Sequence, residues 1–327
     1  MKFETTGLAC RAMTSGPSRA AILLALLSVN ATVAVPAGAT NDDSKTSHGA
    51  PSQVNPVGWL CDYAYSAFNA TPSVNAISAA QWSCSESARF VVANGLPDHE
   101  VGVFPNRNNP PTLSAQHVAA AMPLLPIFTN TVTRRDSPRA GPGYILNGVK
   151  MDPSTAGTCD SSGTQCTLAR GSGAWSIEAM GQNTFKFGTD SSNAHVQPGG
   201  AYHYHGIPEG FVAKLGKGAA MTLIGWAADG FPIYARYGYK VAKDASSGIK
   251  IVTASYQLKS VPSAGRPAIS AYPMGTFTQD YEYLAGSGDL DECNGRMGIT
   301  PEYPAGTYHY FATDTYPYLQ RCVKGKL

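Results

Sequence analysis

The chain has 327 residues, a formal net charge of +2 at pH 7 and a charged fraction of only 14%. Lysine and arginine form no basic stripe, so we expect no nucleic-acid partner. Glycine, proline and tyrosine are abundant, which is typical of short strands joined by turns.

The N-terminal segment predicts export. Basic residues precede the apolar run AAILLALLSVNATVAV at 20–35, and the small residues AGA follow at 37–39. This order is typical of a signal peptide cleaved after Ala39, and the alternative is a retained membrane anchor. We predict a signal peptide at 1–39 and a disordered polar leader at 40–57.

Residues 58–327 are then expected to form a single β domain that is secreted, periplasmic or held at the cell surface. No second long apolar stretch follows, so we predict no membrane span after signal cleavage. A partner, whether a small molecule or a protein, is not identified by the sequence.

The segments along the chain predict a mainly β fold of antiparallel sheets in a sandwich- or barrel-like arrangement. Two segments are predicted as short helices, SVNAISAAQW at 73–82 and LSAQHVAAAM at 113–122, the second between Thr112 as N-cap and Pro123 as stop. Strand-like runs mix β-branched and aromatic residues between turn residues. In chain order they are 88–95, 143–151, 183–190, 219–229, 231–241, 250–259, 276–286 and 307–314.

The cysteines agree with export. Cys10 leaves with the signal peptide, and an even number remains, which predicts three disulfide bonds although six cysteines allow fifteen pairings. Proximity favours Cys61–Cys84, Cys159–Cys166 and Cys293–Cys322. The alternative is a thiolate metal site, but the usual C-x-x-C spacing is absent.

Histidines recur at alternate positions in the stretch PGGAYHYHG at 198–206. Because side chains of a strand alternate between faces, His203 and His205 share one face and the tyrosines beside them share the other. If Pro198-Gly199-Gly200 forms the loop of a hairpin, His195 lies opposite His203. Three imidazoles would then converge, provided that the register does not slip by one residue.

A second stretch, PAGTYHYF at 304–311, repeats the pattern and aligns His309 with His203. We expect His309 to approach the first hairpin, so that His195, His203, His205 and His309 bind one metal ion. Nitrogen ligands suit copper or zinc, whereas calcium and magnesium prefer oxygen.

Four further residues are candidates for a supporting or alternative role at this site. They are His99 beside Asp98, Asp229 in AADGFPIYA, Asp291 in LDECNG and Glu178 in WSIEAMG. Each also has a structural interpretation: Asp229 and His99 as turn residues, Asp291 as part of an acidic or calcium-binding loop, and Glu178 as a strand residue with a buried partner.

Several blocks of the chain resemble the YHYH family, which is named for the motif present here at 202–205. Coverage runs from about residue 90 to 323. The blocks are LPDHEVGVFPN, GYILNGVKMDP, WSIEAMG, DSSNAHVQPGGAYHYHG, GWAADGFPIYARYGY, LDECNG and GTYHYFATDTYPYLQRC. The resemblance implies an exported domain without an assigned reaction. Phe311 departs from the family, in which a histidine is common at this position, so the second copy is expected to supply one histidine.

Three functions fit these observations. The first is an exported protein that binds copper or zinc for sequestration or delivery. The second is a secreted metalloenzyme, a hydrolase or a copper oxidoreductase, with an open coordination position beside the histidines. The third is a structural or adhesive surface domain without catalysis. Bound metal in the purified protein would separate the first two from the third.

Overall fold

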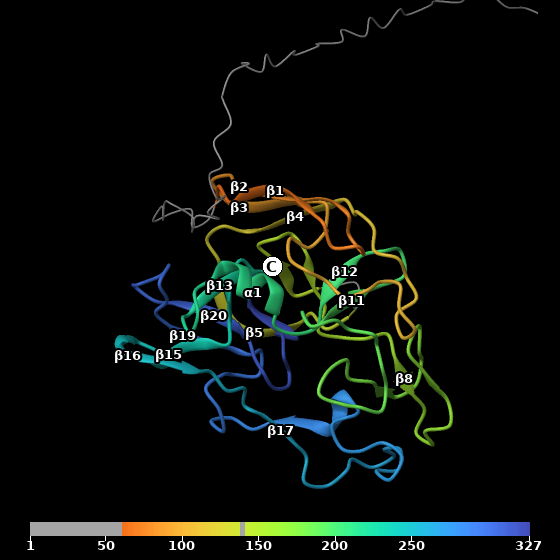
Figure 1. Ribbon diagram of the computed structural model, residues 1–327. Coiled ribbons are helices and arrows are strands. Elements are labelled where there is room, and N and C mark those ends of the chain that lie inside the picture. The colour runs from red at the N-terminus through yellow and green to blue at the C-terminus, as the bar shows by residue number, and fades with distance from the viewer. Residues whose placement is uncertain (1–60, 138–140) are drawn as a thin grey trace, which may run out of the picture. The chain divides into compact units, whose positions relative to one another are not determined.

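Most of the chain is visible in the computed structural model, which describes residues 61–137 and 141–327 (Figure 1). The described residues fall within one compact unit. The predicted signal peptide at 1–39, the leader at 40–57 and the domain boundary at 58 lie outside them.

The largest sheet has eight strands and contains the YHYH motif. Its hydrogen-bonded order is β11-β12-β7-β6-β13-β14-β20-β19, with antiparallel pairing except for the parallel pairs β12–β7 and β14–β20. In that order the strands are Ala194–Val196, Tyr202–Tyr204, Lys150–Met151, Gly143–Ile145, Thr222–Ala227, Pro232–Ala235, Thr307–Ala312 and Gly295–Gly298.

A four-stranded sheet covers part of the eight-stranded sheet. It consists of β1 (Ala64–Asn69), β2 (Ala76–Cys84), β3 (Ala88–Ala93) and β4 (Val118–Pro123). Trp82 of β2 is buried and donates its indole N–H to the carbonyl of Leu146, between β6 and β7, at 2.8 Å. The inner side chains of the two sheets thus share one hydrophobic core.

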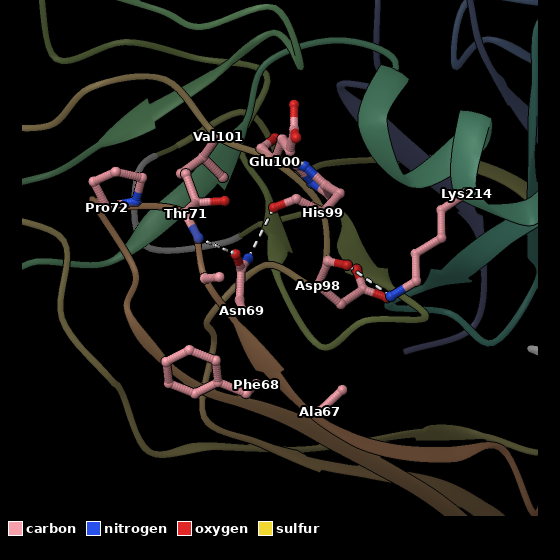
Figure 2. A pocket seen from close by; sticks show the side chains of 11 residues that line it. Ala67, Phe68, Asn69, Thr71, Pro72, Asp98, His99, Glu100, Val101 and Lys214 are labelled. Atoms are coloured by element: carbon pink, nitrogen blue, oxygen red, sulfur yellow. Dashed lines mark hydrogen bonds and ion pairs between the residues drawn. The ribbon is translucent and has the colours of Figure 1, made fainter. Parts of the chain in front are cut away.

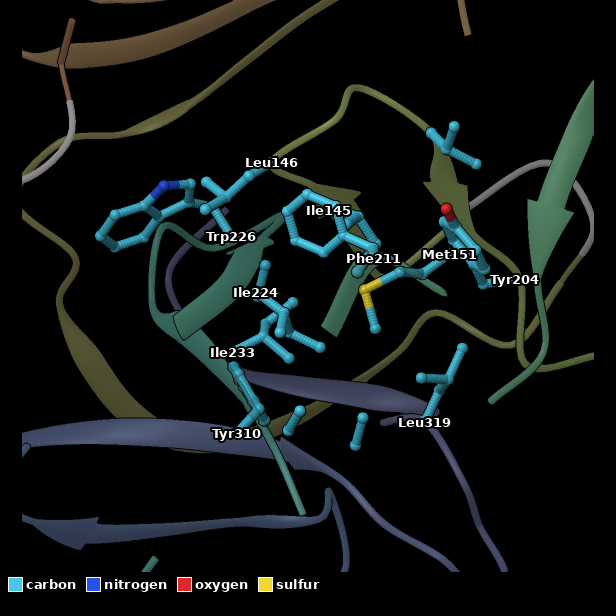
Figure 3. Packing of buried hydrophobic residues seen from close by; sticks show 14 of the residues in the cluster. Ile145, Leu146, Met151, Tyr204, Phe211, Ile224, Trp226, Ile233, Tyr310 and Leu319 are labelled. Atoms are coloured by element: carbon cyan, nitrogen blue, oxygen red, sulfur yellow. The ribbon is translucent and has the colours of Figure 1, made fainter. Parts of the chain in front are cut away.

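That core is built largely from aromatic and β-branched residues of the central strands, as Figure 3 shows around Ile145, Trp226 and Ile233. β13 and β14 are buried along their whole length, because layers cover both of their faces. Continuous burial explains why 219–235 reads as an almost uninterrupted apolar run.

Smaller sheets surround these two. They are β8 (Thr158–Cys159) with β9 (Cys166–Thr167) and β10 (Trp175–Ser176); β15 (Tyr237–Val241) with β16 (Asp244–Ile251); β17 (Tyr256–Leu258) with β18 (Tyr281–Tyr283); and β5 (Phe128–Arg134) with β21 (Cys322–Gly325). The prediction of a mainly β fold with antiparallel sheets is therefore confirmed, and the two parallel pairs are additions that the sequence did not indicate.

Both predicted helices are wrong. Residues 76–84 form β2, and 118–123 form β4, which pairs antiparallel with β3 so that Ala120 lies opposite Val91. Alanine has the highest intrinsic helix propensity, but propensity amounts to less than about 1 kcal/mol per residue for most residues, and pairing within the four-stranded sheet outweighs it here. The predicted strand at 183–190 is also wrong, since none of these residues lies in a strand.

One α-helix was not predicted. Helix α1 (Glu209–Leu215) begins after Pro208, and ends at Gly216, which has a left-handed φ of 65°. The pattern P-x-G-F-V-x-x-L-G has a proline at its start and a glycine at its end, the usual arrangement of helix signals. A 3-10 helix follows much later, at Thr278–Asp280.

The three disulfide bonds pair Cys61 with Cys84, Cys159 with Cys166 and Cys293 with Cys322, as predicted. Each bridge closes a loop of fewer than thirty residues, with sequence separations of 23, 7 and 29. Short loops of this kind make sequence proximity a good guide to the pairing.

The eight-stranded sheet consists of two halves that repeat one pattern of pairing. At its centre β6 and β13 run antiparallel with Tyr144 opposite Trp226. Outward from this pair, the order β7-β12-β11 on one side matches β14-β20-β19 on the other, with the parallel pair in the same place. The register therefore equates residues 143–152 (GYILNGVKMD) with 225–234 (GWAADGFPIY).

Equivalent tyrosines make equivalent hydrogen bonds in the two halves. Tyr202 donates its hydroxyl to Asp190 at 2.7 Å, and its counterpart Tyr308 donates to Asp291 at 2.8 Å. The next tyrosine in each motif bonds the turn of the neighbouring hairpin. Tyr204 accepts from the amide of Asn147 at 2.9 Å, and Tyr310 donates to Asp229 at 2.6 Å. The repeat thus includes its buried polar contacts.

Replacing Tyr202 by Phe should lower the free energy of unfolding by about 1–3 kcal/mol, because a hydrogen bond to a charged acceptor is lost inside the protein. Tyr237→Phe is the matched control: Tyr237 is half-buried, and no hydrogen bond from its hydroxyl is found within 61–137 and 141–327. Denaturant melts of both variants measure the difference, and equal losses would contradict the importance of the Tyr202–Asp190 contact.

Candidate metal centre

The hairpin of β11 and β12 has the predicted register. Gly199 and Gly200 have φ values of 100° and 89°, which a glycine adopts without strain, and Gln197 donates its N–H to Ala201 O at 3.0 Å. His195 consequently lies opposite His203. The loop length fixed this register, as the sequence predicted.

Three imidazoles meet on one face of this hairpin. His205 Nε2 lies 3.1 Å from His195 Nε2 and 3.0 Å from His203 Nε2. All three ligand atoms lie within 4.8 Å of one another. His203 and His205 are buried, at 4% and 2% exposure, whereas His195 is partly exposed and leaves the cluster an edge toward solvent.

The backbone fixes the proton on two of the rings. His195 Nδ1 lies 2.7 Å from Phe187 O, and His203 Nδ1 lies 3.2 Å from Ala201 O. A carbonyl oxygen only accepts, so each Nδ1 donates its hydrogen and each Nε2 has a free lone pair. Without a cation, His205 Nε2 can donate a hydrogen to only one of these two neighbours. An ion bound between the three nitrogens would use all three Nε2 lone pairs once the hydrogen of His205 lies on Nδ1, which is buried and has no hydrogen-bond partner among the described residues.

Burial keeps these rings neutral. It lowers the pKa of His195 below the ordinary value, and lowers the pKa values of His203 and His205 much further, with positive charge on the neighbouring rings adding to the effect. Neutral imidazole is the form that binds a metal. The three rings therefore hold the ligand form around pH 7.

Three charged residues that the sequence analysis missed, Lys150, Asp152 and Arg321, lie near the histidines. Lys150 of β7 is the register partner of His203 across a parallel pair, so both side chains lie on the same face of the sheet. Lys150 Nζ pairs with Asp152 Oδ2 at 3.1 Å. Farther on, buried Arg321 pairs with Glu178 at 2.7 Å and affects His205 electrostatically. The sequence shows Lys150 and Asp152 at alternate positions, but it does not show that their strand pairs with β12.

His309 does not join the cluster, so the expectation that four histidines meet is wrong. β20, which carries His309, is separated from β12 by four strands of the sheet. His309 Nδ1 bonds Thr307 O at 3.1 Å, the counterpart of the contact between His203 and Ala201. The two motifs are thus equivalent in structure but lie in opposite halves of one sheet, where they cannot share an ion.

The second half has lost the other two histidines. Arg296 stands opposite His309, where the first half has His195, and Phe311 stands where it has His205. The guanidinium carbon of Arg296 lies 5.2 Å from the centre of the Phe311 ring, a cation–π contact. The counterparts of Lys150 and Asp152 are Pro232 and Tyr234. This half keeps the framework but only one of the three histidines, His309.

The four supporting candidates are placed as follows. His99 Nε2 accepts from the Tyr204 hydroxyl at 2.7 Å, on the face of β12 that points away from the histidine cluster. Asp229 and Asp291 accept from tyrosines of the second half, far along the sheet from His203. Of the four, only Glu178 lies near the cluster, through its pair with Arg321.

A pocket of about 740 Å³ lies on the tyrosine side of β12. Figure 2 shows its lining, which includes Asn69, Asp98, His99 and Lys214. Several of its polar groups have partners within the protein: Asp98 pairs with Lys214 at 3.1 Å, and the Asn69 amide donates to Pro97 O and His99 O. Because none of the three clustered histidines lines it, this pocket is distinct from the candidate metal centre.

Comparison with known families agrees with this arrangement. The model of a family described as YHYH protein matches residues 119–325, which include both copies of the motif. The chain belongs to the YHYH family. It matches no curated protein and no solved structure. None of the helices in the described part of this YHYH protein is long and apolar enough to cross a membrane.

His309 should make the stability of the metal-free protein depend on pH. Burial lowers its pKa from 6.5 to about 3, so between these values the unfolded chain binds a proton that the folded chain does not. Stability is therefore lost as the pH falls, by up to about 1.4 kcal/mol per pH unit from this residue.

In His309→Gln, the slope of unfolding free energy between about pH 4 and pH 6 should be shallower than in the wild type by that amount. Denaturant melts in a chelator measure it. His117→Gln is the control, because His117 is exposed. An unchanged slope in His309→Gln would count against a neutral, buried His309.

Proposed function

We propose that this YHYH protein is an exported metal-binding protein that holds one copper or zinc ion between Nε2 of His195, His203 and His205. The observation that carries the proposal is the convergence of three neutral imidazole nitrogens, two of which have their lone pairs fixed inward by backbone carbonyls. Such an arrangement is that of metal-binding histidines, whose other ring nitrogen typically donates outward.

The spacing of His205 Nε2 from the other two nitrogens fits a single ion. Two nitrogens bound at 2.0–2.1 Å lie about 2.9–3.4 Å apart for bond angles between octahedral and tetrahedral. Two of the three separations, 3.0 and 3.1 Å, fall within that range. The ligand atoms of His195 and His203 lie within 4.8 Å of each other, whereas two such bonds span at most about 4.2 Å, so one ion would draw these two rings together wherever their separation is larger. Imidazole ligands favour copper and zinc, and within residues 61–137 and 141–327 the group that could hold an ion contains three histidines and no carboxylate of the kind that calcium prefers.

Three protein ligands leave at least one coordination position open. Structural zinc sites usually have four protein ligands, whereas catalytic sites keep a position for water or substrate. The partial exposure of His195 gives that position a route to solvent. This supports exchange at the ion, as in metal delivery or in a metalloenzyme, a hydrolase or a copper oxidoreductase, over a purely structural or adhesive role.

Export is part of the proposal. Three disulfide bonds are compatible with an extracellular location, because such bonds persist in oxidising compartments. The basic and apolar N-terminal sequence supports secretion to the periplasm, the cell surface or the medium.

The mature protein should bind one equivalent of copper(II) or zinc(II). His195→Ala should weaken binding by roughly a hundredfold, because a ligand is lost, and His195 is the least buried of the three, so that the fold tolerates its loss. His203→Ala should do the same or more. Calorimetric titration and elemental analysis measure affinity and stoichiometry.

His117→Ala provides the matched control, since it removes an exposed histidine outside the cluster. Its affinity should equal that of the wild type. A metal-free wild-type protein that takes up neither ion, or wild-type affinity in both His195→Ala and His203→Ala, would overturn the proposal and leave the structural role.

A further inference from the structure

We infer that the open coordination position of the bound ion takes a small anion, a carboxylate or another oxyanion, held there by Lys150. This inference rests on the proposed metal binding. The inference goes beyond metal binding because it assigns the chemical class of the exchangeable ligand and the residue that selects this ligand.

The strands place Lys150 beside the ion. β11, β12 and β7 are neighbours in the sheet, and His195, His203 and Lys150 form one row across them. Neighbouring strands lie about 4.8 Å apart, so the lysine stem starts one strand away from the metal ligands and on the same face. The positive charge of Lys150 acts on all three imidazoles.

The charges around the cluster favour an added anion. Three neutral imidazoles bring no negative charge to a metal cation. Lys150 and Arg321 each have their own carboxylate partner, Asp152 and Glu178. The remaining charge that acts on the rings is that of Asp190, whose oxygens already accept from Tyr202, Gly102 and Ser192. A divalent ion would therefore leave buried positive charge, which an anion bound to it would offset.

Lys150 is difficult to explain by metal storage alone. A cation beside a metal site repels the ion and weakens its binding. In the second half of the sheet two of the three histidines are replaced, and the lysine and the aspartate are replaced as well, since Pro232 and Tyr234 take their places. The Lys150–Asp152 pair thus occurs in the half that has the three histidines.

The exposure of the residues around the cluster determines how an anion would reach the ion from solvent. The side chain of Lys150 is 24% exposed, and His195 is partly exposed, whereas Asp152, His203 and His205 are buried. An anion arriving from solvent would meet the ammonium group first and then the ion. A carboxylate or oxyanion can accept a hydrogen bond from Lys150 Nζ with one oxygen and bind the ion with another.

The test uses the mature, disulfide-bonded protein loaded with copper(II). Azide and acetate, as anionic probes, and imidazole, as a neutral probe, are titrated while the visible and electron paramagnetic resonance spectra are recorded. In Lys150→Met, the affinity for both anions should fall about tenfold, with the affinity for imidazole unchanged and that for copper(II) equal or higher. Lys150→Arg should keep anion binding.

Two further variants make the result specific. Lys150→Met with Asp152→Asn removes the carboxylate that would otherwise be free to occupy the ion, and should show the same loss of anion binding. Lys243→Met removes a lysine from the exposed β15–β16 hairpin and should change nothing. Unchanged azide and acetate affinities in both Lys150→Met proteins would overturn this inference while metal binding stood. A wild-type protein that binds no copper(II) would overturn the proposed function and this inference together.

Discussion

The alternation of side chains along β12 is the constraint on which the site depends. Tyr202 and Tyr204 point into the core, where Asp190 and Asn147 hold their hydroxyl groups. His203 and His205 must then point the other way, because successive side chains of a strand face opposite sides. Since buried hydroxyl groups are costly to leave unpaired, these two contacts fix the orientation of the strand and of the rings with it.

The same alternation is used twice in the sheet and with different results. Tyr308 and Tyr310 have equivalent partners in Asp291 and Asp229, so the second half keeps the packing and polar contacts of the first. Its outer face carries Arg296, His309 and Phe311, which form a cation–π contact and a buried ring in place of a ligand set. The comparison shows that the tyrosine contacts belong to the framework of both halves, whereas the cluster of three histidines belongs to the first half.

Around the cluster, the protein keeps the histidines neutral and places its charges in pairs. The Lys150–Asp152 and Arg321–Glu178 pairs lie beside rings whose pKa values burial has lowered. Such surroundings prepare three lone pairs for an ion but supply no negative charge to balance it. Under the proposed function, the exchangeable ligand of the ion would enter from the partly exposed side, which is bordered by His195 and Lys150.

The sequence by itself determined the local features. A three-residue loop set the register of the hairpin and brought His195 to His203, and short separations paired the cysteines. Tertiary structure alone decided the rest. Alanine-rich segments became β2 and β4 because sheet pairing outweighs helix propensity. His309 lies four strands beyond the cluster, and Lys150 lies next to it, because strand order joins segments some fifty or more residues apart. Periodicity within a segment carries no information about which distant strand will be its neighbour.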